Sequence, residues 1–452
     1  MAFLSAKPEN INFDTDNVGR LLFKLSLPPV TVSLIASIVN FFSGAIVASV
    51  SIDYLTAYTI CNPFCSALVS SMHVGVMNGS SSLTGRNLTD KNAVNKVIFN
   101  SMLLLSFFML IYVLIAIFFA MPFLRLFTSD EKILNIGIKF IYIYAFASIL
   151  TGYSQTIISI LQSLGDTTVT SVFSLISIPI TFILNLITVN GYLGLPKMGL
   201  YGIAVTAIFM SIVNLSFGII RLNIQGFGIF KNREISKSYL KQIFIIAIPS
   251  MLQQFLATTL VSGYNLVIKG ISESAVAVMG VFYNWISIVQ SLNLRFSLFS
   301  IIGSNLALGR KDRLIKTIRY SVGYAFFIGT AFTLFFLLFT KECLDIFNYP
   351  SEQIAQGTYI FRILGIYTLP MILFTILNHL AIALGNSRTG FVALVVQTAI
   401  TLIGGFTFSN TSTTLSLVSF SFAAIAALIA VIVMIYNSKS AELKMIKNAF
   451  IK

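Results

Sequence analysis

Long apolar runs follow one another along most of the chain, and short polar segments separate them. A helix needs about 20 mostly apolar residues to cross a bilayer. The segment GGFTFSNTSTT, which carries no charge, has to hold the last turn between runs. The pattern predicts an all-α integral membrane protein with twelve membrane-spanning helices at residues 24–48, 54–84, 97–122, 133–160, 169–190, 199–222, 242–268, 275–305, 315–340, 354–383, 390–408 and 413–436.

Composition supports this interpretation. Of the 452 residues, 56% are hydrophobic and 10% are charged, whereas a soluble domain has about 25% charged residues. Such a chain cannot cover a water-facing surface of this size. The three cysteines (Cys61, Cys65 and Cys343) form neither a disulfide framework nor a metal-ligand spacing. The polar segment that precedes Arg20 lacks the pattern of a cleaved signal peptide, so we expect the first apolar run to be retained.

The basic residues predict the orientation of the chain in the membrane. With the N-terminus inside, 21 of the 29 Lys and Arg residues fall on the cytoplasmic side and six on the external side. Basic residues concentrate in cytoplasmic loops, so this bias favours an even number of spans with both termini cytoplasmic. The net charge of +14 is therefore a topology signal. We assign it no nucleic-acid partner and expect a multi-pass protein of the cell membrane.

The second half of the chain repeats motifs of the first at a nearly constant offset in residue number. Leu-Gly-Asp-Thr at 164–167 is matched by Leu-Gly-Asn-Ser at 384–387, and Pro28 is matched by Pro249. These anchors predict two similar lobes of six helices each, residues 1–230 and 231–452. Six is an even number, so both lobes enter the membrane the same way up. They are then parallel repeats about a pseudo-two-fold axis along the membrane normal, with a cleft between them.

The two Leu-Gly turns are expected to be structural. Gly165 and Gly385 supply the backbone conformation for a tight corner. The side chains of Asp166 and Asn386 are expected to cap the helix that follows each turn.

An ordered set of short motifs resembles one transporter family. Proline begins the first and seventh spans, the Gly-Arg pairs of LTGRN and LALGRKD end the second and eighth, LGDT follows the fourth, and MGLYGIAVT opens the sixth. Together they resemble the multidrug and toxic compound extrusion (MATE) transporters over nearly the whole chain. The resemblance implies a two-lobed antiporter that exports amphiphilic, often cationic, small molecules against a Na⁺ or H⁺ gradient. It implies no cofactor beyond the coupling cation, and we expect a monomer in the lipid bilayer.

The carboxylates that such coupling usually needs are missing, because no Asp or Glu lies in the middle of a predicted span. A buried carboxylate can cycle a proton or ligate Na⁺. Members of the family commonly have Asn-x-x-Asp in helix 1, where this chain has Asn40 and Ser43. In helix 5 the corresponding polar positions are Thr181 and Asn185, and Thr206 matches a polar position of helix 6.

The second half departs in the same way. Ala257 stands where some members have a Glu, with Gln253 and Gln254 one turn earlier, and Met371 aligns near an Asp of other branches. The stretch GVFYNWISIVQ at 280–290 holds the single Trp, and we expect it to line the cleft through Asn284.

Two interpretations of the neutral polar set remain open. Asn40, Ser43, Thr181, Asn185 and Thr206 could ligate Na⁺ weakly through neutral oxygens. They could instead form hydrogen bonds between helices, as Asn, Ser and Thr do in membranes. Asn185 is the strongest single candidate.

Apart from basic residues near the ends of spans, we place Arg295, Arg362, His73 and His379 within the membrane. A charge at Arg295 is costly unless it faces a cavity or a partner. Arg362 is nearer the outer leaflet, where a long side chain can reach water. His379 and His73 are either proton carriers or packing residues, since the unperturbed pKa of histidine is about 6.5.

These observations predict a MATE-like exporter that works by alternating access. The alternatives are a flippase of the same superfamily for lipid or lipid-linked oligosaccharide, and a receptor or scaffold built on a transporter that no longer transports. We do not expect an enzyme, because the spans contain no nucleophile–base pair and no His/Asp/Glu/Cys constellation.

Overall fold

A computed structural model describes residues 16–48, 52–125, 128–269, 273–292, 294–346, 354–408, 413–438 and 440–451. The described chain is helical apart from its turns and loops. The first half contains α1 (Val18–Ala48), α2 (Ile52–Arg86), α3 (Lys91–Arg125), α4 (Glu131–Ser163), α5 (Thr167–Asn190) and α6 (Leu200–Ile224). The second half contains α7 (Lys237–Lys269), α8 (Glu273–Ser291), α9 (Arg295–Ala307), α10 (Lys311–Leu338), α11 (Thr340–Asp345), α12 (Ile354–Gly365), α13 (Thr368–Ala383), α14 (Arg388–Phe408), α15 (Thr413–Asn437) and α16 (Ala441–Ile451).

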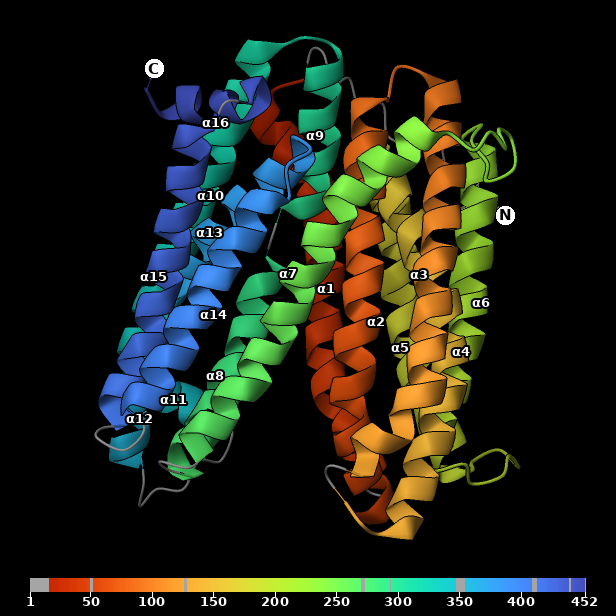
Figure 1. Ribbon diagram of the computed structural model, residues 1–452, viewed down its shortest axis with the longest axis vertical. Coiled ribbons are helices and arrows are strands. Elements are labelled where there is room, and N and C mark those ends of the chain that lie inside the picture. The colour runs from red at the N-terminus through yellow and green to blue at the C-terminus, as the bar shows by residue number, and fades with distance from the viewer. Residues whose placement is uncertain are drawn as a thin grey trace.

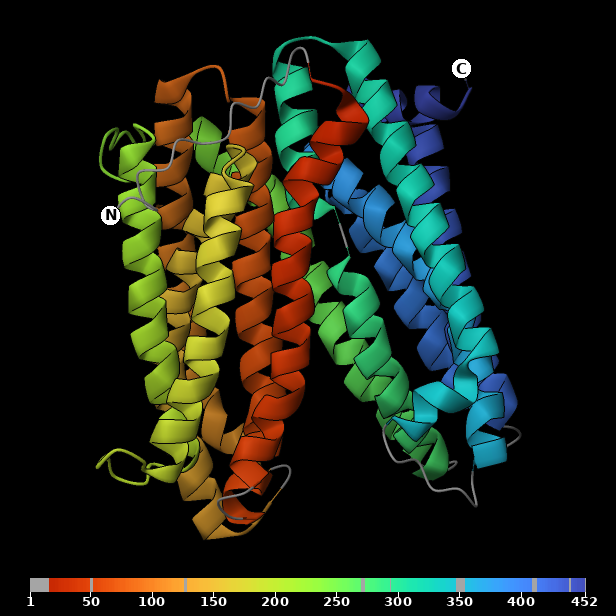
Figure 2. The same cartoon turned by 180° about the vertical axis from the view of Figure 1, so that it is seen from behind.

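The helices form two bundles that stand side by side (Figures 1 and 2). One bundle holds α1 to α6 and the other holds α7 to α16. The start of α1 and the whole of α16 lie at the same end of the molecule. We call this end the terminal face and the other end the opposite face. Helix α7 leans across from the second bundle towards the first and packs against both α2 and α14.

Ten helical segments of the described chain are long and apolar enough to cross a membrane. The two further predicted spans correspond to α2 and to α8 with α9, which occupy equivalent places in the two halves. Helix α2 is less apolar because protein surrounds it, with α3, α4, α7 and α9 as neighbours. Between Ser71 and Gly85 every residue except Val74 is buried. A helix shielded from lipid can carry polar side chains that a lipid-facing helix cannot.

Two predicted spans are broken helices. The run 275–305 is divided into α8 and α9, and the run 354–383 into α12 and α13. The second break precedes Pro370, which has no amide hydrogen to donate to the carbonyl of Ile366. Counting apolar runs also missed the short α11 and the amphipathic α16, because neither is long enough to cross a bilayer.

The two Leu-Gly turns have the predicted backbone but differ in their polar contacts. Gly165 and Gly385 have φ angles of 92° and 82°, which confirms the glycine corner. Asn386 caps α14, because its Oδ1 accepts hydrogen bonds from the backbone amides of Arg388 (3.1 Å) and Thr389 (3.4 Å). The predicted cap is wrong for Asp166, whose side chain makes no capping hydrogen bond to α5.

Asp166 instead forms a buried ion pair with Arg221 of α6. Arg221 donates from Nε to Oδ2 at 2.5 Å and from Nη2 to Oδ1 at 3.2 Å. Gln225 donates to the same Oδ2 at 2.5 Å. Arg221 is fully buried and Asp166 is 3% exposed. A guanidinium held out of water needs its carboxylate partner, so the pair fastens the α4–α5 turn to the end of α6.

We expect Asp166→Ala to lower the stability of the protein far more than Asn386→Ala. The first change leaves a buried guanidinium unpaired, which costs about 3–5 kcal/mol. The second removes a helix cap, which costs about 1 kcal/mol. Thermal unfolding of the purified, detergent-solubilised variants measures both. Equal shifts in the unfolding midpoint would contradict the structural importance of the ion pair.

Candidate functional site

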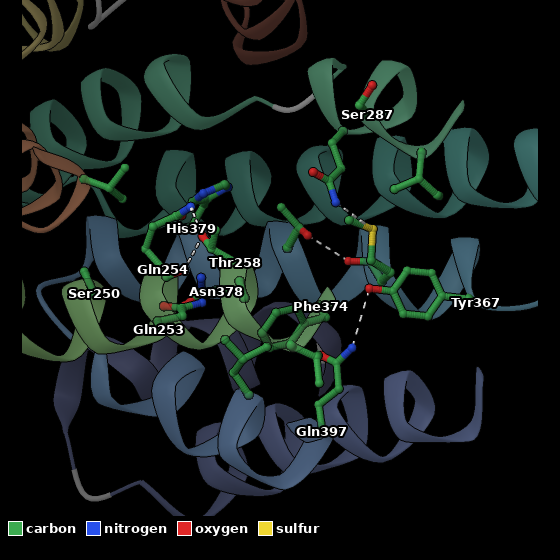
Figure 3. Close-up of a pocket in the computed structure, with 18 of the residues that line it drawn as sticks. Ser250, Gln253, Gln254, Thr258, Ser287, Tyr367, Phe374, Asn378, His379 and Gln397 are labelled. Carbon is green, nitrogen blue, oxygen red and sulfur yellow. Dashed lines mark hydrogen bonds between the residues drawn. The ribbon is translucent and has the colours of Figure 1, made fainter. Parts of the chain in front are cut away.

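A cavity of about 460 Å³ lies within the second bundle, where α2 of the first bundle reaches its edge. Its wall comes from α7, α8, α13, α14, α15 and the α12–α13 junction, with two residues from α2. Figure 3 draws 18 of the lining residues and labels ten of them. The lining residues are Val74, Asn78, Ser250, Gln253, Gln254, Ala257, Thr258, Leu260, Tyr283, Ile286, Ser287, Gln290, Tyr367, Met371, Phe374, Thr375, Asn378, His379, Leu394, Gln397 and Phe420.

One side of the cavity is aromatic. The rings of Tyr367 and Phe420 stack with their centroids 4.8 Å apart, and Tyr283 meets Phe420 edge-on at 6.4 Å. Gln397 of α14 donates to the hydroxyl oxygen of Tyr367 at 3.5 Å. These contacts hold the rings in fixed orientations beside the space that a flat apolar molecule could fill.

The other side of the cavity is polar and uncharged. His379, Gln254 and Thr258 lie close together there, with Gln253 and Asn378 nearby (Figure 3). Gln254 Nε2 lies 3.4 Å from the hydroxyl of Thr258, to which it donates. Helices α7 and α13 supply these side chains, so a change in the packing of these two helices would change the polar wall.

Three deeply buried oxygens line the same cavity. They are Oδ1 of Asn78, Oγ of Ser250 and Oδ1 of Asn378, and no hydrogen-bond partner for them occurs in the described part of the chain. The three residues are 4%, 2% and 5% exposed. Buried polar atoms are nearly always satisfied. The oxygens of Asn78 and Ser250 are therefore candidates to meet a polar ligand group, an ion or water, whereas Oδ1 of Asn378 packs against Gly390 of α14.

Among the residues that the structure describes, the cavity lining contains no carboxylate, lysine or arginine. His379 is the one histidine of this lining. Across the described residues, no cluster of three or more His, Cys, Asp or Glu side chains is arranged to hold a metal. Any ion bound in the cavity would therefore be held by neutral oxygens or nitrogens.

The structure brings three of the ten predicted site residues into the cavity wall, namely Gln253, Gln254 and His379. Asn284 is exposed on α8 and donates to the carbonyl of Gly280 at 3.0 Å, outside the lining. Within the stretch 280–290, Tyr283, Ile286, Ser287 and Gln290 line the cavity instead. The indole of Trp285 donates to the carbonyl of Cys343 on α11.

The predicted residues of α5 and α6 lie in the first bundle. The hydroxyl of Thr206 is 3.0 Å from that of Thr188, which joins the two helices. Thr181 donates to the carbonyl of Ser177 in its own helix. Oδ1 of Asn185 is buried, with no hydrogen-bond partner among the described residues.

Three predicted side chains lie outside the described part of the structure. Asn40 and Ser43 belong to α1, and Arg295 begins α9, but the side chains at these positions are not described. His73 is buried against α4, where a Cβ on Gly152 would come within 2.6 Å of its Nε2. Arg362 is exposed on α12.

Several polar residues of the cavity were not predicted from the sequence. Three of them are amides within apolar runs, namely Gln290, Asn378 and Gln397. Their position was a usable signal, because a polar side chain inside a membrane usually has a function. Ser250 and Asn78 gave no such signal, since small polar residues also serve ordinary helix packing.

The two bundles are joined near the terminal face by a pair of matching contacts. Ser82 at the end of α2 donates to the carbonyls of Ile382 (2.8 Å) and Ala383 (3.3 Å). Ser300 of α9 donates to the carbonyls of Gln162 (2.8 Å) and Ser163 (3.0 Å). These two pairs of carbonyls directly precede the two Leu-Gly turns, at equivalent positions of the repeat. Each half therefore contributes one serine that holds the equivalent helix end of the other.

Between these contacts, α2 and α9 cross at Gly85 and Gly303. A Cβ on Gly303 would lie 2.3 Å from the backbone of Gly85, and one on Gly85 would lie 2.4 Å from the carbonyl oxygen of Phe299. Glycine is therefore required for this approach. We call Ser82, Gly85, Ser300 and Gly303, with the four carbonyls, the serine–glycine latch.

A family model, a protein relative and solved structures all point to the same family. The MatE family model matches residues 28–187 and 234–407, one stretch in each half. A Bacillus cereus protein named "Probable multidrug resistance protein NorM" is 24% identical over 299 residues, which are 64% of each chain. The chain thus aligns with just under two thirds of the length of this relative.

Two solved structures share the fold. One is titled "Outward-facing conformation of a multidrug resistance MATE family transporter of the MOP superfamily" and aligns with a TM-score of 0.82 at 17% identity, over 98% of each chain. The other is a MOP superfamily transporter from Pyrococcus furiosus whose title reports a binding pocket of reversed polarity. It has a TM-score of 0.82 at 17% identity, over 99% of this chain and 98% of the other.

Loss of both latch serines should open the terminal side. In a variant with its three native cysteines replaced, Ser250→Cys serves as a reporter inside the cavity. We expect Ser82→Ala with Ser300→Ala to raise the rate at which a charged thiol reagent on the terminal side labels this cysteine, because each lost hydrogen bond removes about 1 kcal/mol. Ser321→Ala is the control, since Ser321 is buried but bonds only the carbonyl of Thr317 in its own helix. Unchanged labelling in the double variant would mean that the latch does not close this side.

Proposed function

Because the chain belongs to the MatE family, we propose that it is a secondary active exporter of small amphiphilic molecules, driven by a Na⁺ or H⁺ gradient. The name of its Bacillus cereus relative agrees with drug export. The observation that carries the proposal is a ligand-sized cavity beside a closed contact between two equivalent bundles. At about 460 Å³, the cavity is within the range of roughly 300–1,000 Å³ typical of small-molecule sites.

Transport would occur by alternating access of this cavity. We propose that residues 1–230 and 231–452 are parallel repeats that rock against each other. The separate matches of the family model in the two halves support this division. In the structure the latch holds the bundles together at the terminal face. In the other state these hydrogen bonds would break, and the cavity would open towards that face.

The terminal face is proposed to be cytoplasmic. The ends of the helices on this face carry many basic residues, including Arg86, Lys91, Arg310, Lys311 and Lys316. Cytoplasmic loops carry an excess of Lys and Arg. Both termini would then lie inside the cell, and export would proceed from the terminal face to the opposite face.

The cargo is proposed to be an uncharged or weakly charged amphiphile. A carboxylate in the lining would favour a cation and an arginine an anion, but the described lining has neither. The aromatic wall of Tyr283, Tyr367 and Phe420 suits a flat apolar body. The amides and hydroxyls of the facing wall can hydrogen-bond a polar substituent.

Coupling is proposed to involve the polar wall, with His379 as the proton carrier. Its imidazole lies in the cavity, so it can exchange a proton with whichever side the cavity faces. Na⁺ coupling through neutral oxygens would instead use the first bundle, where Asn185 is the predicted ligand.

Efflux from proteoliposomes with separately imposed Na⁺ and H⁺ gradients tests these proposals. We expect an uncharged fluorescent amphiphile to be exported when a proton gradient is applied, and His379→Gln to lower that flux at least about tenfold, since the proton carrier is lost. Asn284→Ala is the control: it changes a residue of the cavity-forming helix α8 that lies outside the lining, and it should leave the flux unchanged.

The other outcomes separate the parts of the proposal. Flux driven by Na⁺ and lost in Asn185→Ala would move the coupling to the first bundle. Export of a cationic dye of the same size in preference to the uncharged one would contradict the assignment of cargo. If neither gradient drives any of these compounds, the chain is not an exporter of this class.

A further inference from the structure

A second hollow lies on the membrane-facing side of the α7–α16 bundle, away from the cavity described above. It is an apolar groove of about 680 Å³ between α10 and α15. Helix α13 packs against both of these helices, and α16 packs against them at the terminal face. Figures 1 and 2 show these four helices together at the outer edge of the bundle. The groove is lined by Arg319, Val322, Gly323, Phe326, Leu373, Leu377, Leu428, Ile432, Ile435, Tyr436, Ile446 and Lys447.

The groove has the length and position of a lipid tail. On α15 its lining runs from Leu428 to Tyr436, which is about 12 Å along a helix axis. One leaflet contributes about 15 Å of hydrocarbon to a bilayer. The groove starts beneath α16, an amphipathic helix whose Leu443, Ile446 and Ala449 are buried. It therefore extends from the level of the membrane surface towards the middle of the bilayer.

The terminal end of the groove is basic. Lys447 of α16 places its ammonium 3.7 Å from the ring centroid of Tyr436. Arg319 of α10 is exposed and donates from Nε to the carbonyl of Ala449 at 2.6 Å. The acid of α16, Glu442, lies 3.6 Å from Arg86 and accepts a hydrogen bond from Ser440. Positive charge at the mouth of an apolar groove complements an acyl chain that carries an anionic head group.

Gly323 keeps the groove open. A Cβ at this position would meet no atom within 4 Å in the described structure, although the residue lies in the middle of α10. Glycine weakens a helix interior, and here a larger side chain would fit without a clash. A larger side chain would occupy the space beside Phe326 that the groove provides.

We propose that this groove is a binding site for an anionic phospholipid of the leaflet at the terminal face. One acyl chain lies along α13 between α10 and α15, and the phosphate is held at Lys447 and Arg319. Bilayer lipid is as apolar as the groove, so burial of the chain alone gives little selectivity. The charge of the head group must then supply the selectivity. Each basic residue at the mouth of the groove should raise the preference for an anionic lipid about fivefold. The site is separate from the transport cavity and does not depend on transport.

Native mass spectrometry of the purified protein tests the proposal, with equal amounts of phosphatidylglycerol and phosphatidylethanolamine added. We expect the wild-type protein to retain one phosphatidylglycerol in preference to phosphatidylethanolamine. Lys447→Gln should lower this preference about fivefold, and Lys447→Arg should keep it. Gly323→Trp should remove the retained lipid, because the indole fills the groove.

Two matched variants control for general effects. Lys316→Gln removes an exposed charge from α10, one turn nearer the terminal face than Arg319 and outside the groove, and should not change the preference. Phe327→Trp places the same indole at a position on α10 that is 71% exposed and outside the groove, and should retain lipid.

Three results would overturn the proposal. They are equal retention of the two lipids by the wild type, a loss of preference in Lys316→Gln as large as in Lys447→Gln, and full retention of phosphatidylglycerol by Gly323→Trp. The unfolding midpoint of Gly323→Trp is measured as well. An unchanged midpoint shows that a loss of lipid binding is not caused by misfolding. Because the readout is lipid binding, failure here leaves the proposed export untouched, and failure of export leaves this site untouched.

Discussion

Helices α2 and α9 cross at Gly85 and Gly303 so closely that neither position has room for a Cβ. This contact determines how the two bundles meet. It brings Ser82 and Ser300 within hydrogen-bonding distance of the helix ends opposite, and it is formed by α2, a helix that is polar because protein surrounds it. Within a membrane, backbone approach through small residues and serine hydrogen bonds replaces the hydrophobic driving force available in water. Such contacts are individually weak, so a joint made of them can break and reform.

The fold was largely predictable, because the bilayer imposes a length and an apolar composition on each spanning helix. The repeated motifs Leu164-Gly165 and Leu384-Gly385 correctly predicted the two glycine turns. Apolar runs carried no information on where a span breaks, so the divisions α8/α9 and α12/α13 were missed. The amphipathic α16 was missed because it lies against the bundle without crossing the membrane.

The candidate site was less predictable. Gln253, Gln254 and His379 were named in advance, but the cavity also depends on Asn78, which α2 brings from the other half. The local pattern of polar and apolar residues does not predict contacts between segments that are far apart in the sequence. The two halves also differ in the polar contacts of their Leu-Gly turns. In the first, Asp166 pairs with buried Arg221, whereas in the second Asn386 only caps a helix. The described cavity lies in the second half, with two lining residues from α2 of the first.

The central claim is that the latch must open for transport. The most direct measurement is efflux by a variant with Ser82→Cys and Ala383→Cys, two positions that are in contact across the latch. A short bifunctional thiol reagent would join them in a background without the native cysteines. The account predicts that cross-linking abolishes efflux and that a cleavable reagent restores it on cleavage. Full efflux by quantitatively cross-linked protein would contradict it, because transport would then proceed with the terminal side closed.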